Sequence, residues 1–168
     1  TTRKPRTGEK DGIHFHFLQE EDFKDKDKFL ETAIVHGTHY GTLKREIEDK
    51  LRSEKKVILV IDVQGADYVL KHYKQLLKDV VTIFITTEKL STIVDRIKLK
   101  NDPNVEERIN SIKKEIKFLP LYKYIINTSK SKEESLEDIK AVIYGYKEKI
   151  IKIKEFTKKF NVENFFNN

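Results

Sequence analysis

The chain has 168 residues, no cysteine, and 34 basic against 28 acidic residues, so its formal net charge is +6. This length predicts a single domain with its own hydrophobic core, and the lack of cysteine excludes disulfides and thiolate metal sites. No apolar run reaches the roughly 20 residues that span a bilayer, and acidic residues are interleaved with the basic ones throughout. We therefore expect neither a membrane nor a nucleic-acid partner.

The first nine residues, TTRKPRTGE, form a basic segment interrupted by proline and glycine. Arg3 and Arg6 lie close together there, and Glu9 follows. Because Pro5 and Gly8 disfavour a helix interior, the two guanidinium groups can converge on one small anion such as phosphate. The same pattern fits an ordinary solvated basic segment, and both interpretations stay open.

The first forty residues predict a small β-rich lobe. Residues 12–17 (GIHFHF) alternate as a strand does, and residues 29–42 (FLETAIVHGTHYGT) contain short extended pieces broken by Gly37 and Gly41. The five histidines lack carboxylates at convincing ligand spacing, so we interpret them as surface or packing residues.

Two polar side chains of this lobe match the hydrogen-bonding edge of guanine. The carboxylate of Glu31 can accept from two N–H groups, and the hydroxyl of Thr42 can donate to a neighbouring carbonyl oxygen. Adenine presents an acceptor nitrogen there, which would leave a buried group unpaired. Alternatively, Glu31 is a surface carboxylate and Tyr40 a packing aromatic.

The remaining chain alternates between predicted strands and helices, which predicts an α/β fold with a parallel sheet. The predicted buried strands are residues 56–63, 80–86 and 122–127. The predicted helices that separate and flank them are residues 43–51, 66–77, 90–99 and 108–118. One amphipathic helix is predicted from about Glu133 to Ile153.

Two further groups of charged residues are candidates for ligand binding. Asp62 follows the first predicted buried strand, at the end where α/β sheets bind ligands; it would orient Mg²⁺ through water, hold a basic loop, or cap the next helix. Arg96, Lys98, Lys100 and Arg108 flank the polar segment KNDPN, which suits either a mobile lid over a phosphate site or a solvated helix face.

Four motifs, in this order, resemble the guanylate kinase family: TTRKPRTGEKDG, FLE followed by HGTHYGT, LVIDVQG, and a strand that ends in Asn127. The resemblance runs from Thr1 to about Ile143. It implies a cytoplasmic enzyme that transfers the γ-phosphoryl group of ATP to GMP, with Mg²⁺ accompanying ATP. It also implies a P-loop-kinase-like parallel core with helices on both faces, a GMP-binding lobe at about 3–42 and a lid at about 98–108.

The resemblance also implies roles for individual residues, and it implies no metal ligand and no particular oligomeric state. The GMP-binding set comprises Arg3, Arg6, Glu9, Glu31, Tyr40, Gly41, Thr42, Asp62, Gln64 and Gly65. The catalytic residues would be Arg3, Arg96 and Arg108. The ATP-binding residues would be Arg96, Arg108 and Asn127.

The chain departs from the family pattern at several points. The family's phosphate-binding loop with its lysine would precede Thr1, so we expect a longer protein whose intact mass exceeds 19.9 kDa. Phe15, Val60 and Lys100 stand where a tyrosine, a carboxylate and an arginine are common. A second possible function is that of guanylate-kinase-like modules that have lost phosphoryl transfer and bind phosphopeptides.

Overall fold

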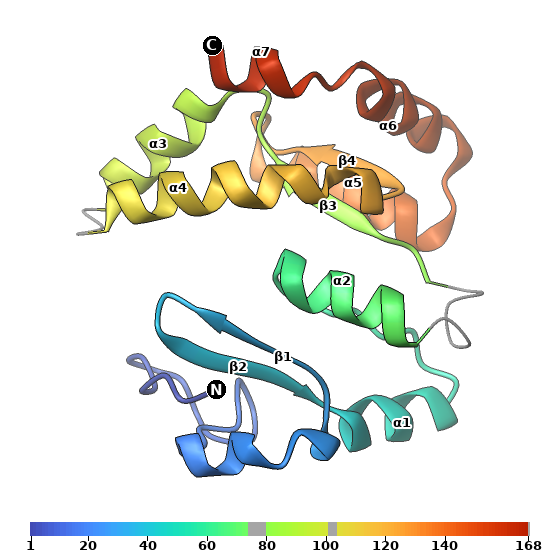
Figure 1. Ribbon diagram of the computed structural model, residues 1–168. Coiled ribbons are helices and arrows are strands. Elements are labelled where there is room, and N and C mark those ends of the chain that lie inside the picture. Colours follow the sequence, from blue (N-terminus) through green and yellow to red (C-terminus); the bar gives the residue numbers. More distant parts are fainter. Residues whose placement is uncertain (74–79, 101–103, 168) are drawn as a thin grey trace. The chain divides into compact units, whose positions relative to one another are not determined.

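The computed structural model describes residues 1–73, 80–100 and 104–167 (Figure 1). The chain divides into two compact units, Thr1–Lys78 and Asp79–Asn168. Within the described ranges, no helix combines the length and the apolar character needed to cross a membrane.

The first unit is built on an antiparallel hairpin (Figure 1). Two short 3₁₀ helices, η1 (Glu20–Lys24) and η2 (Lys26–Lys28), lead into β1 (Phe29–Val35) and β2 (Thr38–Leu43). His36 and Gly37 form the two-residue turn, with φ of 48° and 71°, which is the left-handed pair that a tight hairpin requires. The short extended pieces predicted within residues 29–42 are confirmed as these two strands.

The predicted strand at residues 12–17 is wrong. This stretch forms a turn, with Gly12 at φ 72° and a single bridge between Asp11 and Phe15. The N–H groups of Ile13 and His14 both donate to the Lys10 carbonyl oxygen. Because these local bonds satisfy the backbone, the alternation of apolar and polar residues does not produce a strand here.

The predicted buried strand at residues 56–63 is also wrong. Residues 56–62 form neither strand nor helix between α1 (Lys44–Arg52) and α2 (Val63–His72), and Val60 is 95% exposed. None of the described strands pairs with it, and an apolar β-branched run forms a sheet only with a hydrogen-bonded neighbour. The helix predicted at 66–77 begins earlier, at Val63, and residues 74–77 lie outside the described part.

The second unit contains a parallel pair of strands, as the sequence predicts, although both are shorter than expected. β3 (Ile83–Thr86) pairs with β4 (Tyr124–Asn127), and Thr86 lies opposite Asn127. Three helical segments connect them: α3 (Leu90–Leu99), α4 (Val105–Glu115) and the 3₁₀ segment η4 (Ile116–Leu121). The fold class is therefore α/β, as predicted.

The C-terminal region forms three helices, α5 (Lys132–Tyr144), α6 (Lys147–Lys159) and α7 (Val162–Asn167). The single helix predicted from Glu133 to Ile153 is wrong. Gly145 adopts φ 79°, and its N–H and that of Tyr146 both donate to the Ala141 carbonyl oxygen. Glycine adopts this left-handed conformation without strain, so α5 ends there although the apolar periodicity continues.

Candidate functional site

The basic loop is organised by one bidentate ion pair. Arg3 donates from Nη1 and Nη2 to the two carboxylate oxygens of Glu9, at 2.9 Å each, and the Arg6 backbone N–H donates to Glu9 Oε2 at 2.7 Å. The hydrogen bond from Arg3 is the main reason that the pKa of Glu9 falls to about 2, and the same bond raises the pKa of Arg3. The loop is therefore a defined structure in which Glu9 holds the Arg3 fork.

The side chains of Arg6 and Phe15 have different surroundings. The Arg6 side chain is exposed and has no hydrogen-bond or ion-pair partner among residues 1–73, 80–100 and 104–167. The Phe15 ring lies under the Arg3 guanidinium, 5.2 Å from its carbon, and meets Tyr40 edge-on. Phe15 thus contacts Arg3 through the face of its ring and offers no hydroxyl there.

The buried Glu31 and the half-buried Thr42 form a polar pair across the hairpin. They are register partners on β1 and β2, and Thr42 Oγ1 donates to Glu31 Oε1 at 2.7 Å. Glu31 is only 4% exposed, and this burial raises the pKa of its carboxyl group, with the negative charge of Asp62 acting in the same direction. The hairpin therefore brings together the two residues that the sequence assigned to base recognition.

The first turn of α2 closes against this pair. Asp62 caps the helix: its Oδ1 accepts from the Gly65 N–H at 2.8 Å, and its Oδ2 accepts from Gln64 Nε2 at 3.1 Å. A Cβ on Gly65 would lie 2.6 Å from Glu31 Oε2, a separation that real structures do not allow. The helix-cap interpretation of Asp62 is confirmed, and Gly65 is required because a side chain would displace the Glu31 carboxylate.

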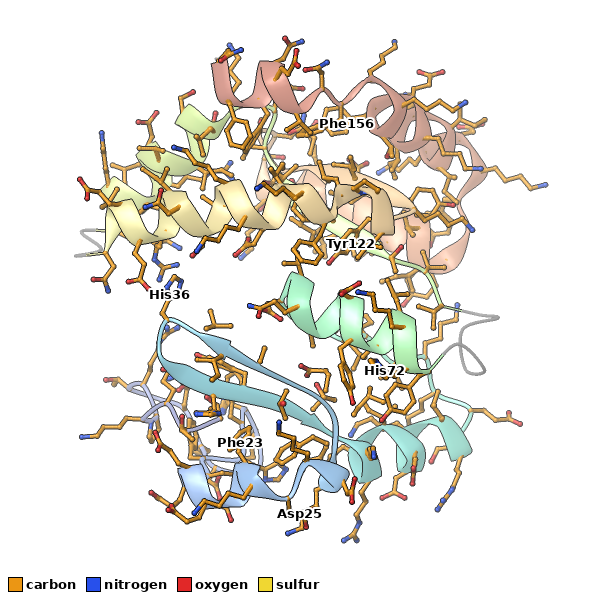
Figure 2. The ribbon with its side chains drawn as sticks, viewed as in Figure 1. Phe23, Asp25, His36, His72, Tyr122 and Phe156 are labelled. Carbon is orange, nitrogen blue, oxygen red and sulfur yellow. The ribbon has the colours of Figure 1, made fainter. Side chains whose placement is uncertain are left out.

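Gly41 has a packing reason of the same kind. A Cβ there would lie 2.8 Å from the Phe29 ring and 3.2 Å from the Phe23 ring. These two rings stack at 4.8 Å between centroids and fill the space beside the hairpin, where Figure 2 labels Phe23. Gly41 thus lets the aromatic pair support the strand that carries Thr42.

In the second unit, Asn127 lies at the carboxyl end of β4, where parallel sheets bind ligands. Its Nδ2 donates to Glu88 Oε1 at 2.7 Å, and its Oδ1 accepts from the Ser129 N–H at 2.8 Å. Asn127 and Glu88 line a pocket of about 460 Å³ together with residues of α5 and α6. Sequence analysis missed Glu88, although its position just after β3 places it at the same sheet end.

Arg96 lies beside this strand end. It donates from both Nη atoms to Thr128, which follows Asn127 directly; the Nη1 bond to Thr128 Oγ1 is 3.2 Å long. Arg108 is exposed on the first turns of α4. The predicted lid at 98–108 lies partly outside the described residues, because 101–103 are not among them; Lys98 and Lys100 are exposed at the end of α3.

The described residues include no group of three or more histidine, aspartate and glutamate side chains placed to hold a metal ion. The structure thus assembles two polar sites, each within its own unit. One contains the Arg3 loop, the Glu31–Thr42 pair and the first turn of α2. The other contains Asn127, Glu88 and Arg96.

Comparison with known proteins extends these findings. The guanylate kinase family model matches residues 1–146. The chain is 39% identical over 156 residues to a guanylate kinase of Helicobacter pylori (strain ATCC 700392 / 26695), covering 88% of this chain and 74% of that protein. A guanylate kinase of Clostridium perfringens (strain SM101 / Type A) is 37% identical over 161 residues, with coverages of 92% and 72%. The crystal structure of guanylate kinase from Anaplasma phagocytophilum superposes with a TM-score of 0.62 at 26% identity, covering 86% of this chain and 71% of that one.

Proposed function

Because the chain belongs to the guanylate kinase family, a family of nucleoside monophosphate kinases, we propose that it transfers the γ-phosphoryl group of ATP to GMP, giving ADP and GDP. The observation that carries this proposal is the hydrogen bond from Thr42 to the buried carboxylate of Glu31. We place the reaction in the cytoplasm, where its nucleotide substrates occur.

The base would be recognised through the Glu31 carboxylate. Its two oxygens accept hydrogen bonds from the ring N–H and the amino group of guanine, and adenine has no matching pair of donors at that edge. In the structure, the Thr42 hydroxyl proton is directed to Glu31 Oε1. Donation to the guanine carbonyl therefore requires that hydroxyl to rotate when the base binds.

The phosphate of GMP would be bound by the basic loop. Arg6 offers an exposed charge, whereas Arg3 is held in a fixed orientation by Glu9, with Tyr40 adding to its raised pKa. The acceptor phosphate is itself a nucleophile, so transfer depends on positioning and charge neutralisation rather than on a strong base. We assign the binding and charge neutralisation of the GMP phosphate to Arg3 and Arg6.

ATP would be bound on the Asn127 side, with Arg96 and Arg108 supplying positive charge near its phosphates. Mg²⁺ would arrive with ATP, bound chiefly by phosphate oxygens and water, which requires no dedicated protein cage. Both Asp62 oxygens already accept hydrogen bonds in the helix cap. We therefore propose no direct protein ligand for Mg²⁺ among the described residues.

A coupled assay of ADP production by the full-length protein tests the proposal. We expect turnover with ATP and GMP, and at least a hundredfold lower kcat/KM with AMP, because recognition by buried polar groups typically discriminates by about 10⁴ or more. Binding of GMP without turnover would contradict a kinase and favour the phosphopeptide-binding function. Equal use of AMP would contradict the assignment of Glu31 to the base.

A further inference from the structure

The C-terminal helices α6 and α7 are part of the core of the second unit, although residues 147–168 lie beyond the family-model match. Phe165 of α7 is fully buried against Ile116, Leu119 and Ile125. Phe156 of α6, labelled in Figure 2, packs against the same cluster. This segment is therefore integral to the fold around β4.

One side chain of α6 completes the hydrogen bonding of β4. On the edge that faces β3, the N–H groups of Tyr124 and Thr128 donate to β3-side carbonyls. Ile125 follows Tyr124, so its N–H lies on the opposite edge, away from β3, where it donates to Thr157 Oγ1 at 2.9 Å; the Thr157 hydroxyl donates to the Ile153 carbonyl at 2.8 Å. Thr157 thus takes the place of a neighbouring strand at this point of the outer edge of β4.

This contact lies close to the candidate ATP-side residues. Ile125 is two residues before Asn127 on the same strand, and α6 supplies part of the wall of the pocket that Asn127 and Glu88 line. Both α6 and β4, labelled in Figure 1, belong to the second unit, and they pack against each other. A helix fixed to the strand at Ile125 therefore also fixes the pocket wall relative to Asn127.

We infer that Thr157 is a positioning residue: it holds the outer edge of β4 and so keeps Asn127 aligned with Glu88 and the pocket. The role in nucleotide binding rests on the proposed function, whereas the structural role does not. Thr157 lies beyond residues 1–146, the part of the chain that the family model matches.

The structural role is tested by NMR on the full chain with Thr157→Val, which keeps the shape but removes the hydroxyl, and Thr157→Ser, which keeps the hydroxyl. We expect the valine variant to speed hydrogen exchange of the Ile125 amide at least about tenfold relative to Ile126, because a buried donor loses its acceptor. We also expect a shift of the Asn127 side-chain amide resonances. The serine variant should keep both the exchange ratio and the Asn127 resonances as they are in the wild type. An unchanged Ile125-to-Ile126 exchange ratio would overturn the inference.

Thr82→Val is the matched control for nucleotide binding. Thr82 Oγ1 accepts from the Lys123 N–H at 2.8 Å and donates to the Leu121 carbonyl at 3.0 Å. Like Thr157, it satisfies a backbone N–H through its hydroxyl, but at the opposite end of β4. We expect Thr157→Val to raise the KM for ATP several-fold and to leave the KM for GMP unchanged, and Thr82→Val to change neither. An equal rise of the ATP KM in both variants would refute positioning by Thr157. Absence of any GMP phosphorylation by the wild type would refute the proposed function, and the exchange ratio would still decide the role of Thr157.

Discussion

Replacement of Glu31 by glutamine changes base recognition while leaving the shape of the site intact. In the structure both carboxylate oxygens have close neighbours: Oε1 accepts from the Thr42 hydroxyl at 2.7 Å, and Oε2 lies where it leaves no room for a Cβ on Gly65. A glutamine amide presents one acceptor and one donor, so one guanine N–H group would face another N–H group. Loss of a hydrogen bond to a charged partner costs about 1.5–3 kcal/mol, which corresponds to about 10–150-fold in kcat/KM for GMP.

The assay is ADP release with GMP and with AMP as alternative acceptors. We expect the ratio of kcat/KM for GMP to kcat/KM for AMP to fall about 10–150-fold in Glu31→Gln. The same ratio should stay constant in Glu48→Gln, which changes an exposed carboxylate on α1. An unchanged ratio in Glu31→Gln would refute guanine recognition by Glu31.

The stability of the Glu31→Gln variant separates loss of recognition from loss of the fold. Burial raises the pKa of Glu31, so its contribution to stability is fully present below the unfolded pKa and is lost as pH rises through the folded pKa. Ionisation of this buried carboxyl group therefore lowers stability, and a glutamine amide does not ionise. We expect Glu31→Gln to unfold in urea at neutral pH at the same denaturant concentration as the wild type or higher.

Other predictions concern the basic loop, the α2 turn and the core. Arg6→Ala should lower kcat/KM for GMP at least about tenfold, since a charge-assisted phosphate contact contributes about 1.5–3 kcal/mol; an unaltered value would argue against phosphate binding. Gly65→Ala should weaken GMP binding by about 1–3 kcal/mol in calorimetry by displacing the neighbouring carboxylate, and unchanged affinity would contradict that close approach. Phe165→Ala should lower the free energy of unfolding by about 3–5 kcal/mol in urea titrations, and a smaller loss would mean that α7 is not part of the core. Glu9, with its pKa lowered to about 2 from 4.5, contributes stability above pH 4.5 that is lost as the pH falls toward 2, so the stability difference between wild type and Glu9→Gln should vanish in acid.

Much of the candidate site could be predicted because its signals are local. The hairpin follows from extended residues around His36–Gly37, and its register places Glu31 opposite Thr42. Likewise, β3 and β4 were predicted from short β-branched runs, and their parallel pairing from the helices between them. Such features depend on backbone conformations and spacings that neighbouring residues determine.

The tertiary structure decided what depends on distant partners. The apolar run at 56–63 has the composition of a strand, yet no described strand pairs with it, so it forms no strand and Val60 is exposed. The pairing of Asn127 with Glu88 and the contact of Thr157 with Ile125 join residues whose proximity no local pattern encodes. The sequence alone therefore determined which chemical groups are available, and packing decided which of them meet, because hydrogen bonds and burial require partners that only the folded chain brings together.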